Sequence, residues 1–247
     1  MEPLHERTGT RPVPACPTRR FAGWLPAGMV DWPGKVTATM FLAGCTFACP
    51  YCHNPALRGL GSCAPDGWKP FVRHLREKRA WLDGVVVTGG EPTEDPDLPS
   101  LLAALAEEGL PVKVDTNGAN PAVLSHVIAE DLVAYVAMDV KTTWERYDEV
   151  TRIPGIVRLV AESAGVLLLS EVRHEFRTTL YPGVVDLEEL PRIAEDLAEG
   201  ELYALQQFRP ERTLQRRAAE TPAYTFDKVL PVARRCNSHI PTIVRGL

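Results

Sequence analysis

The chain has 247 residues, with 27 lysines and arginines against 32 aspartates and glutamates, a formal net charge of −5, and 45% hydrophobic residues. This composition is typical of a folded globular protein and excludes a disordered or fibrous chain. No run of about five like charges offers a surface for nucleic acid or anionic lipid, so we expect neither a nucleic-acid nor a membrane partner. The longest apolar stretch is shorter than the about 18 residues that a membrane span needs. The first residues lack the apolar core of a signal peptide. For these two reasons we expect a cytoplasmic protein.

The first 22 residues differ from the rest in composition. They hold four prolines among polar and basic side chains. We therefore expect a flexible arm over residues 1–22. Residues 23–247 contain no linker, repeat or low-complexity tract, so we expect them to form a single domain.

Strand and helix patterns alternate along this domain. Short β-branched or apolar runs predict strands at 36–42, 84–88, 112–115, 133–140 and 202–208, with one or two more within 166–178. Helical periodicity predicts helices at 71–81, 98–108, 122–130, 156–164 and 187–198, and a last helix at 227–234 precedes a short strand at 240–244. About six strand-helix units with nearly continuous apolar strands indicate an α/β protein with a parallel sheet covered by helices, either a barrel or an open sheet.

Three of the six cysteines lie close together as C-x3-C-x2-C, at Cys45, Cys49 and Cys52. Buried structural thiols rarely cluster in this way, and a zinc ion would need a fourth ligand, for which His53 is the nearby candidate. Iron-sulfur clusters are bound by thiolates, and a four-iron cluster held by three of them keeps one iron open. An iron-sulfur cluster is favoured over these two alternatives.

Polar motifs follow the predicted strands at the edge where parallel α/β folds bind ligands. They are Thr88-Gly89-Gly90-Glu91-Pro92, Asp115-Thr116-Asn117-Gly118, Met138-Asp139-Val140-Lys141 and Arg177. Each has an ordinary alternative: a tight turn for the glycines, helix capping and turns for the aspartates, and a surface position for the arginine.

Several segments together resemble a known family. They are GWLP at 23–26, VDWPGK at 30–35, FLAGCTFACPYCHNP at 41–55, YALQQFRP at 203–210 and VRG at 244–246. The chain resembles the radical S-adenosylmethionine (SAM) activases of glycyl-radical enzymes, most closely the anaerobic ribonucleoside-triphosphate reductase activating proteins. The resemblance covers essentially residues 23–247 and implies a partial (β/α)6 barrel with the cysteine loop after its first strand.

The resemblance also implies cofactors and the residues that hold them. One 4Fe-4S cluster would be bound by the catalytic Cys45, Cys49 and Cys52, beside SAM. The residues that match the family's SAM contacts are Tyr51, His53, Asn54, Gly89, Gly90, Glu91, Asp115, Asn117, Asp139, Lys141 and Arg177. A monovalent cation beside the SAM carboxylate would be held by Asp115, Thr116, the Met138 carbonyl and Asp139.

The implied reaction is reductive cleavage of SAM, followed by hydrogen abstraction from a glycine of a partner enzyme. That partner would be a class III ribonucleotide reductase, and a flavodoxin- or ferredoxin-type protein would donate the electron. A pyruvate formate-lyase-type activase, a small-molecule radical SAM enzyme such as a 7-carboxy-7-deazaguanine synthase, a zinc module and a non-enzymatic scaffold stay open as alternatives.

Two features depart from the family pattern. Some activases hold the adenine with a histidine near the last strand, where this chain has Gln206 and Gln207. Activases with extra clusters carry further cysteine motifs, whereas here only Cys63 follows closely. Cys16, Cys63 and Cys236 are therefore interpreted as incidental thiols.

Overall fold

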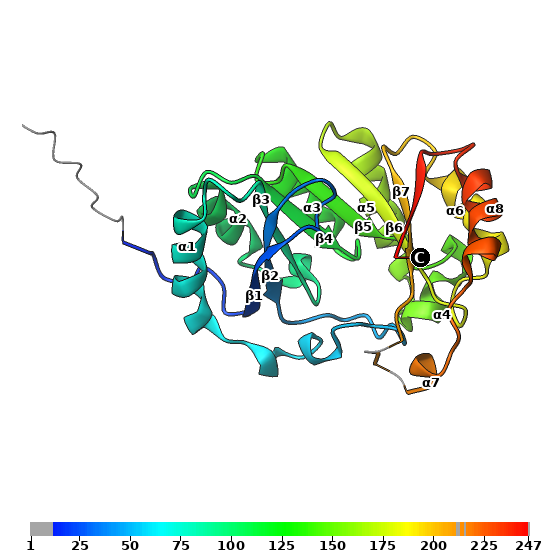
Figure 1. Ribbon diagram of the computed structural model, residues 1–247, viewed down its shortest axis with the longest axis horizontal. Helices are drawn as coiled ribbons and strands as arrows, with labels where there is room; N and C mark the ends of the chain where they lie inside the picture. Colours follow the sequence, from blue (N-terminus) through cyan, green and yellow to red (C-terminus); the bar gives the residue numbers. More distant parts are fainter. Residues whose placement is uncertain (1–11, 211–212, 215, 247) are drawn as a thin grey trace, which may run out of the picture.

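The computed structural model describes residues 12–210, 213–214 and 216–246 (Figure 1). Its centre is one eight-stranded sheet in the order β1 to β8, in which β1 runs antiparallel to β2 and every later pair is parallel. The strands are β1 (Phe21–Gly28), β2 (Thr37–Leu42), β3 (Gly84–Gly89), β4 (Val112–Thr116), β5 (Tyr135–Asp139), β6 (Arg173–Leu180), β7 (Tyr203–Gln207) and β8 (Thr242–Arg245).

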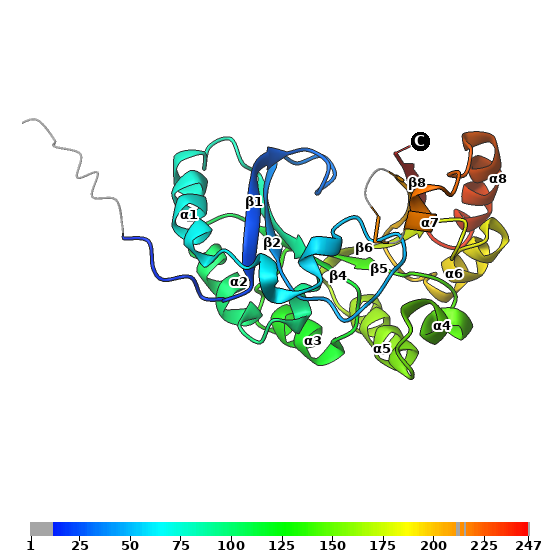
Figure 2. The same ribbon diagram turned by 90° about the horizontal axis from the view of Figure 1, so that it is seen from below.

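Helices cover one side of this sheet. They are α1 (Trp68–Glu77), α2 (Leu98–Ala106), α3 (Pro121–Ala129), α4 (Tyr147–Thr151), α5 (Ile156–Leu169), α6 (Leu190–Asp196) and α8 (Phe226–Cys236). The short helix α7 (Arg216–Ala219) lies apart from them, between β7 and α8 along the chain. Figure 2 shows the sheet curving within an arc of helices that runs from α1 and α2 through α3 and α5 to α6 and α8. β1 and β8 are the two ends of the sheet order, so the barrel is partial, and the predicted α/β partial barrel is confirmed.

The apolar pattern of each element explains this layering. In α2, Leu98, Leu101, Leu102 and Leu105 are all fully buried, because their spacing places them on one face of a helix. Burying each such side chain contributes about 1.5–3 kcal/mol of transfer free energy. The chain turns out of the helix at Gly109, whose φ of +74° a side chain would disfavour.

The inner side of the curved sheet is closed at its amino-terminal mouth by a small apolar cluster. Trp32, from the connection between β1 and β2, packs with Val86 of β3 and with Tyr135 and Ala137 of β5. The Trp32 and Tyr135 rings lie 5.7 Å apart between centroids. The opposite, carboxyl-terminal mouth is where the polar motifs lie.

Several predicted boundaries differ from the structure. Thr18 and Phe21 are buried and β1 begins at Phe21, so the folded part starts before Gly23; residues 1–11 of the predicted arm lie outside the described residues. Glycine and proline within β1 hid this strand from the sequence pattern. Helix α5 extends to Leu169, so the first residues of the predicted 166–178 strand are helical, because an apolar run suits either element. No helix in the described part of the chain is long and apolar enough to span a bilayer.

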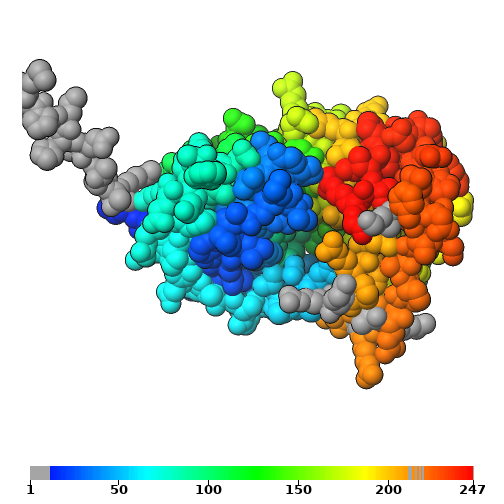
Figure 3. Space-filling view, viewed as in Figure 1, coloured from blue at the N-terminus to red at the C-terminus, as the bar shows by residue number. Residues whose placement is uncertain are grey.

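In the space-filling view, the surface is hollowed between the blue N-terminal segments and the orange and red C-terminal segments, with green central elements at its floor (Figure 3). The curved sheet therefore leaves one side of its interior accessible.

Candidate active site

A pocket of about 250 Å³ lies at the carboxyl-terminal mouth of the sheet. It is lined by Cys45, Phe47, Cys49, Tyr51, Cys52, His53, Asn54, Thr88, Gly89, Gly90, Glu91, Asp115, Thr116, Asn117, Asp139, Lys141, Arg177, Thr179 and Gln206. The structure thus brings together every residue that the sequence singled out for the site except Met138. That residue is fully buried in the core, with its side chain against Gly118.

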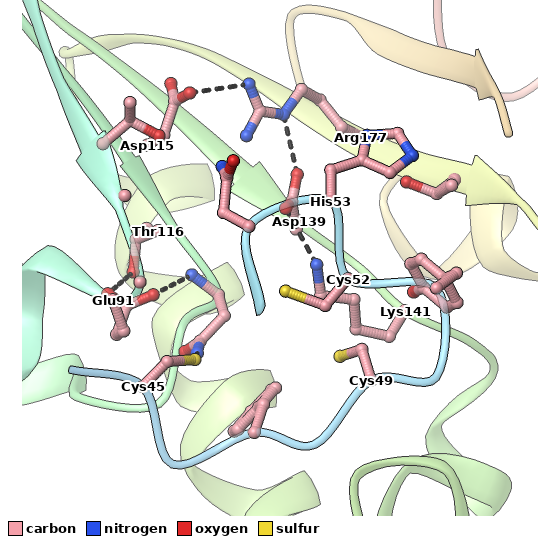
Figure 4. A pocket seen from close by; sticks show the side chains of 18 of the residues that line it. Cys45, Cys49, Cys52, His53, Glu91, Asp115, Thr116, Asp139, Lys141 and Arg177 are labelled. Carbon is pink, nitrogen blue, oxygen red and sulfur yellow. Dashed lines mark hydrogen bonds and ion pairs between the residues drawn. The ribbon is translucent and has the colours of Figure 1, made fainter. Parts of the chain in front are cut away.

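The loop after β2 carries the three cysteines and runs beneath the sheet toward the C-terminal half (Figure 1). Backbone hydrogen bonds close it at its base, from Gly44 N to the Leu57 carbonyl at 2.7 Å and from Cys45 N to the Arg58 carbonyl at 3.1 Å. The Arg58 side chain crosses the loop and donates to the Phe47 carbonyl at 2.9 Å. Figure 4 shows the sulfur atoms of Cys45, Cys49 and Cys52 turned toward one common space.

Burial shifts the pKa of two of the three thiols, Cys45 and Cys49. Burial, with the nearby Glu91 carboxylate, raises the pKa of Cys45 to about 12. Burial also raises the pKa of Cys49, although Lys141 opposes it. A thiol that serves as a nucleophile has its pKa lowered instead, so Cys45 and Cys49 are not tuned for covalent cysteine catalysis.

The zinc alternative finds no support in the geometry. Within residues 12–210, 213–214 and 216–246, no three cysteine, histidine, aspartate or glutamate side chains are placed to hold one metal ion. The ring of His53, the candidate fourth ligand, is within hydrogen-bond distance of the Arg209 carbonyl, at 3.1 Å. In a four-iron cluster, by contrast, each thiolate binds a different iron, which suits sulfurs that face a wider space.

The Gly89-Gly90 pair lets β3 approach the base of the cysteine loop. A Cβ on Gly89 would lie 2.2 Å from the Leu42 carbonyl oxygen, and one on Gly90 would lie 2.1 Å from that of Gly44. Gly90 N donates to the Leu42 carbonyl at 2.8 Å, and Glu91 N donates to the Gly44 carbonyl at 2.6 Å. The glycines are therefore required by a close approach of backbones and not only by a turn.

The Glu91 carboxylate is buried and holds the next strand end in place. Its Oε1 accepts from the hydroxyls of Thr93 and Thr116 at 2.6 and 2.7 Å, and its Oε2 accepts from Asn117 N at 2.6 Å. Burial raises the Glu91 pKa, although these hydrogen bonds oppose the shift. Asn117 in turn directs its amide toward the Cys45 sulfur at 3.8 Å, so Glu91 links the glycine turn to the cysteine loop.

Two aspartates and three cations form a network across the floor of the pocket. Arg177 donates from Nε to Asp139 at 2.7 Å and from Nη1 to Asp115 at 3.1 Å. Lys141 donates to the second Asp139 oxygen at 2.8 Å, and Lys113 donates to the second Asp115 oxygen at 2.5 Å. Three positive side chains face two carboxylates, which leaves this network one positive charge in excess.

The network fixes the charge state of its members. Burial alone would raise the pKa of Asp115 and Asp139, but the Arg177 guanidinium, with Lys113 or Lys141, holds both below their usual range. Burial would lower the pKa of Lys141, but Asp139 holds it well above its usual value. Asp115, Asp139, Lys141 and Arg177 are therefore ionised at neutral pH.

The remaining pocket residues come from the loop and from the last strands. The Tyr51 ring packs 5.4 Å from that of Tyr181. The Asn54 carbonyl accepts from Leu57 N at 2.9 Å, at the start of a short 3-10 helix. The sequence missed three lining or network residues: Phe47, Thr179 and Lys113. The signal for Lys113 was its position two residues before Asp115, which places both side chains on one face of a strand.

The scattered cysteines lie away from the pocket. Cys236 is buried in α8, and burial raises its pKa to about 11. Cys16 and Cys63 are half-buried beside β1 and after a 3-10 helix. None of the three lines the pocket, in keeping with incidental thiols.

Comparison with family models matches residues 39–197 to the Radical SAM superfamily. The chain belongs to this superfamily. Membership implies that this radical SAM enzyme uses a 4Fe-4S cluster and SAM.

Comparison with individual proteins indicates which radical SAM proteins this chain is similar to. One relative is a Methanocaldococcus jannaschii protein that is provisionally named glycyl-radical enzyme activating enzyme MJ1227. It is 30% identical to this radical SAM enzyme, and the aligned region covers 90% of this chain and 94% of the relative. The anaerobic ribonucleoside-triphosphate reductase-activating protein of Salmonella typhi is 29% identical over 34% of the chain and 56% of its own length. Among solved structures, TYW1 with a lysine-pyruvate adduct bound has a TM-score of 0.60 at 14% identity, over 83% of this chain and 74% of that one, which shows a shared fold.

Proposed function

We propose that this enzyme is an activase, which cleaves SAM and leaves a glycyl radical on a partner enzyme, a class III ribonucleotide reductase. The observation that carries the proposal is the convergence of the three cysteine sulfurs, the glycine turn and the aspartate-arginine network on one pocket. Three thiolates suit a four-iron cluster with one iron open to SAM. When bound, the reduced cluster supplies the electron that splits SAM into methionine and a 5′-deoxyadenosyl radical.

The chain's own residues position and shield this chemistry. Glu91 holds Asn117 beside the cysteine loop, so the two sides of the pocket keep a fixed separation. The Gly90 backbone lies against the same loop and presents no side chain that would block a ligand. Arg177 and Lys141 add positive charge opposite an anionic group such as the SAM carboxylate, and the low dielectric strengthens that attraction.

A protein substrate is favoured by two observations. The relative that matches most of the chain is provisionally named for activation of a glycyl-radical enzyme, and the Salmonella relative for activation of anaerobic ribonucleoside-triphosphate reductase. The sheet is also a partial barrel whose two edge strands are β1 and β8, with a hollowed face between the terminal segments that a protein loop could enter (Figure 3). The electron donor that we propose is a flavodoxin- or ferredoxin-type protein.

The test is anaerobic reconstitution with iron and sulfide, followed by reduction and assay of 5′-deoxyadenosine with and without a class III ribonucleotide reductase. Electron paramagnetic resonance then reports whether the reductase carries a glycyl radical. We expect cleavage and a radical in the wild type, neither in Cys49→Ala, and both in the matched control Cys63→Ala.

Each other outcome contradicts a defined part of the proposal. SAM cleavage without a protein radical would refute the reductase as partner and point to another protein or to a small molecule. Full activity of Cys49→Ala would refute the cluster assignment. If the protein binds zinc but no iron, the cluster assignment would be wrong and the cysteine loop would be a zinc site.

A further inference from the structure

Lys113 is a charged side chain in the interior that neither the family motifs nor the reaction accounts for. It lies in β4 and is fully buried. Its Nζ donates to Asp115 at 2.5 Å and to the backbone carbonyl of Asp31 at 2.6 Å. It also lies 6.0 Å from the centroid of the Tyr135 ring, whose face attracts a cation.

The second acceptor of Lys113 comes from the segment that closes the barrel. Asp31 precedes Trp32, which plugs the amino-terminal mouth against Val86, Tyr135 and Ala137. The Asp31 carboxylate accepts from the Thr39 hydroxyl at 2.7 Å, which fixes this residue on β2. The first two residues of the Asp-Trp-Pro-Gly motif therefore face the interior, where the Asp31 carbonyl oxygen accepts from the Lys113 ammonium.

The side-chain acceptors expected for a monovalent cation are already engaged. The four carboxylate oxygens of Asp115 and Asp139 each accept from one donor of Lys113, Arg177 or Lys141. The hydroxyl of Thr116, another expected ligand, donates to Glu91. Three cationic side chains already face the two carboxylates, so they would repel a further cation, and the residues present do not fit it.

We infer that Lys113 is a built-in replacement for a monovalent cation, and that it is a positioning residue which holds Asp115 against Arg177. The inference rests on the proposed SAM site, because Asp115 and Arg177 line the pocket in which SAM would bind. A tethered ammonium makes the site independent of potassium or sodium. Without it, Asp115 keeps the Arg177 bond and loses the partner of its second oxygen.

This inference predicts opposite behaviour of two variants. Lys113→Ala leaves a space between the Asp115 carboxylate and the Asp31 carbonyl, which are oxygen ligands of the kind that hard cations prefer. Potassium or sodium can then enter and take over the charge. Lys113→Met removes the charge but fills most of the same space, so it is a matched control in which a cation has no room.

The first measurement is thermal unfolding of the cluster-free protein in potassium, sodium or choline chloride at equal ionic strength. We expect one Tm for the wild type in all three salts. In choline, both variants should unfold roughly 5 °C or more below the wild type. Potassium or sodium should raise the Tm of Lys113→Ala saturably and leave Lys113→Met unchanged.

The second measurement is SAM cleavage by the reconstituted enzymes in the same salts. Lys113→Ala should lose about tenfold in rate in choline and recover in potassium or sodium. A wild-type Tm or rate that rises saturably with either cation would overturn the inference, and this arm needs no variant to fold. A Lys113→Ala protein that matches the wild type in choline would overturn it as well. Absence of SAM cleavage in every salt would refute the proposed function, while the unfolding data would still decide the role of Lys113.

Discussion

The ion pair between Arg245 and Glu175 connects β8, at the edge of the sheet, with β6. Arg245, at the end of β8, donates from both terminal nitrogens to Glu175 of β6, at 3.0 and 2.6 Å. The Glu175 side chain is fully buried, whereas that of Arg245 is 23% exposed. The Tyr135 hydroxyl also donates to Glu175, at 3.4 Å. Without Arg245, the buried Glu175 carboxylate would therefore lose its ion pair and keep the long hydrogen bond from the Tyr135 hydroxyl.

We expect Arg245→Met to lower the free energy of unfolding by about 3 kcal/mol, the lower end of the range for breaking a buried pair, because Arg245 is partly solvated. For a chain of this size, that loss corresponds to a fall in Tm of roughly 6–12 °C. Glu175→Gln should cost less, about 1 kcal/mol, because Arg245 lies on an edge strand and can turn toward water. The double variant should recover at least half of the loss caused by Arg245→Met.

The assay is urea unfolding of the cluster-free protein, followed by circular dichroism at about pH 8. Equal losses for the two single variants would show that packing, and not an unpaired buried charge, sets the cost of Arg245→Met.

Two further predictions concern the pocket. In Gly90→Ala, the added Cβ would press against the Gly44 carbonyl, so the reconstituted protein should bind less iron and unfold at a lower Tm. Gly61 has open space around it, so the control Gly61→Ala should match the wild type in both measurements. Burial raises the pKa of Asp139, but Arg177 and Lys141 together outweigh it and hold this pKa below its usual value. The stability from this carboxylate is therefore complete above the usual pKa of about 4 and is lost as pH falls toward the folded-state pKa. The Tm of the wild type should accordingly fall between about pH 5 and pH 3 more steeply than that of Asp139→Asn, and parallel profiles would exclude this linkage.

Much of the fold and of the pocket could be predicted because the signals are local. Buried parallel strands show as apolar runs, and polar residues at their ends meet at one edge of the sheet. The predicted α/β partial barrel is confirmed, and the cysteine loop and the Gly-Gly-Glu turn do share a pocket. The antiparallel β1 and the length of α5 could not be predicted, because glycine and proline interrupt the first and an apolar run suits either helix or strand for the second.

The sequence by itself therefore determined the superfamily, the order of strands and helices, and the edge of the sheet that carries the site, since each depends on spacing within a few residues. Only the tertiary structure decided how the interior charges pair. Lys113 bonds a carbonyl 82 residues away, and Arg245 bonds a carboxylate 70 residues away. Such pairs depend on strand register and on the curvature of the sheet, which bring distant residues face to face and have no trace in the local pattern of the chain.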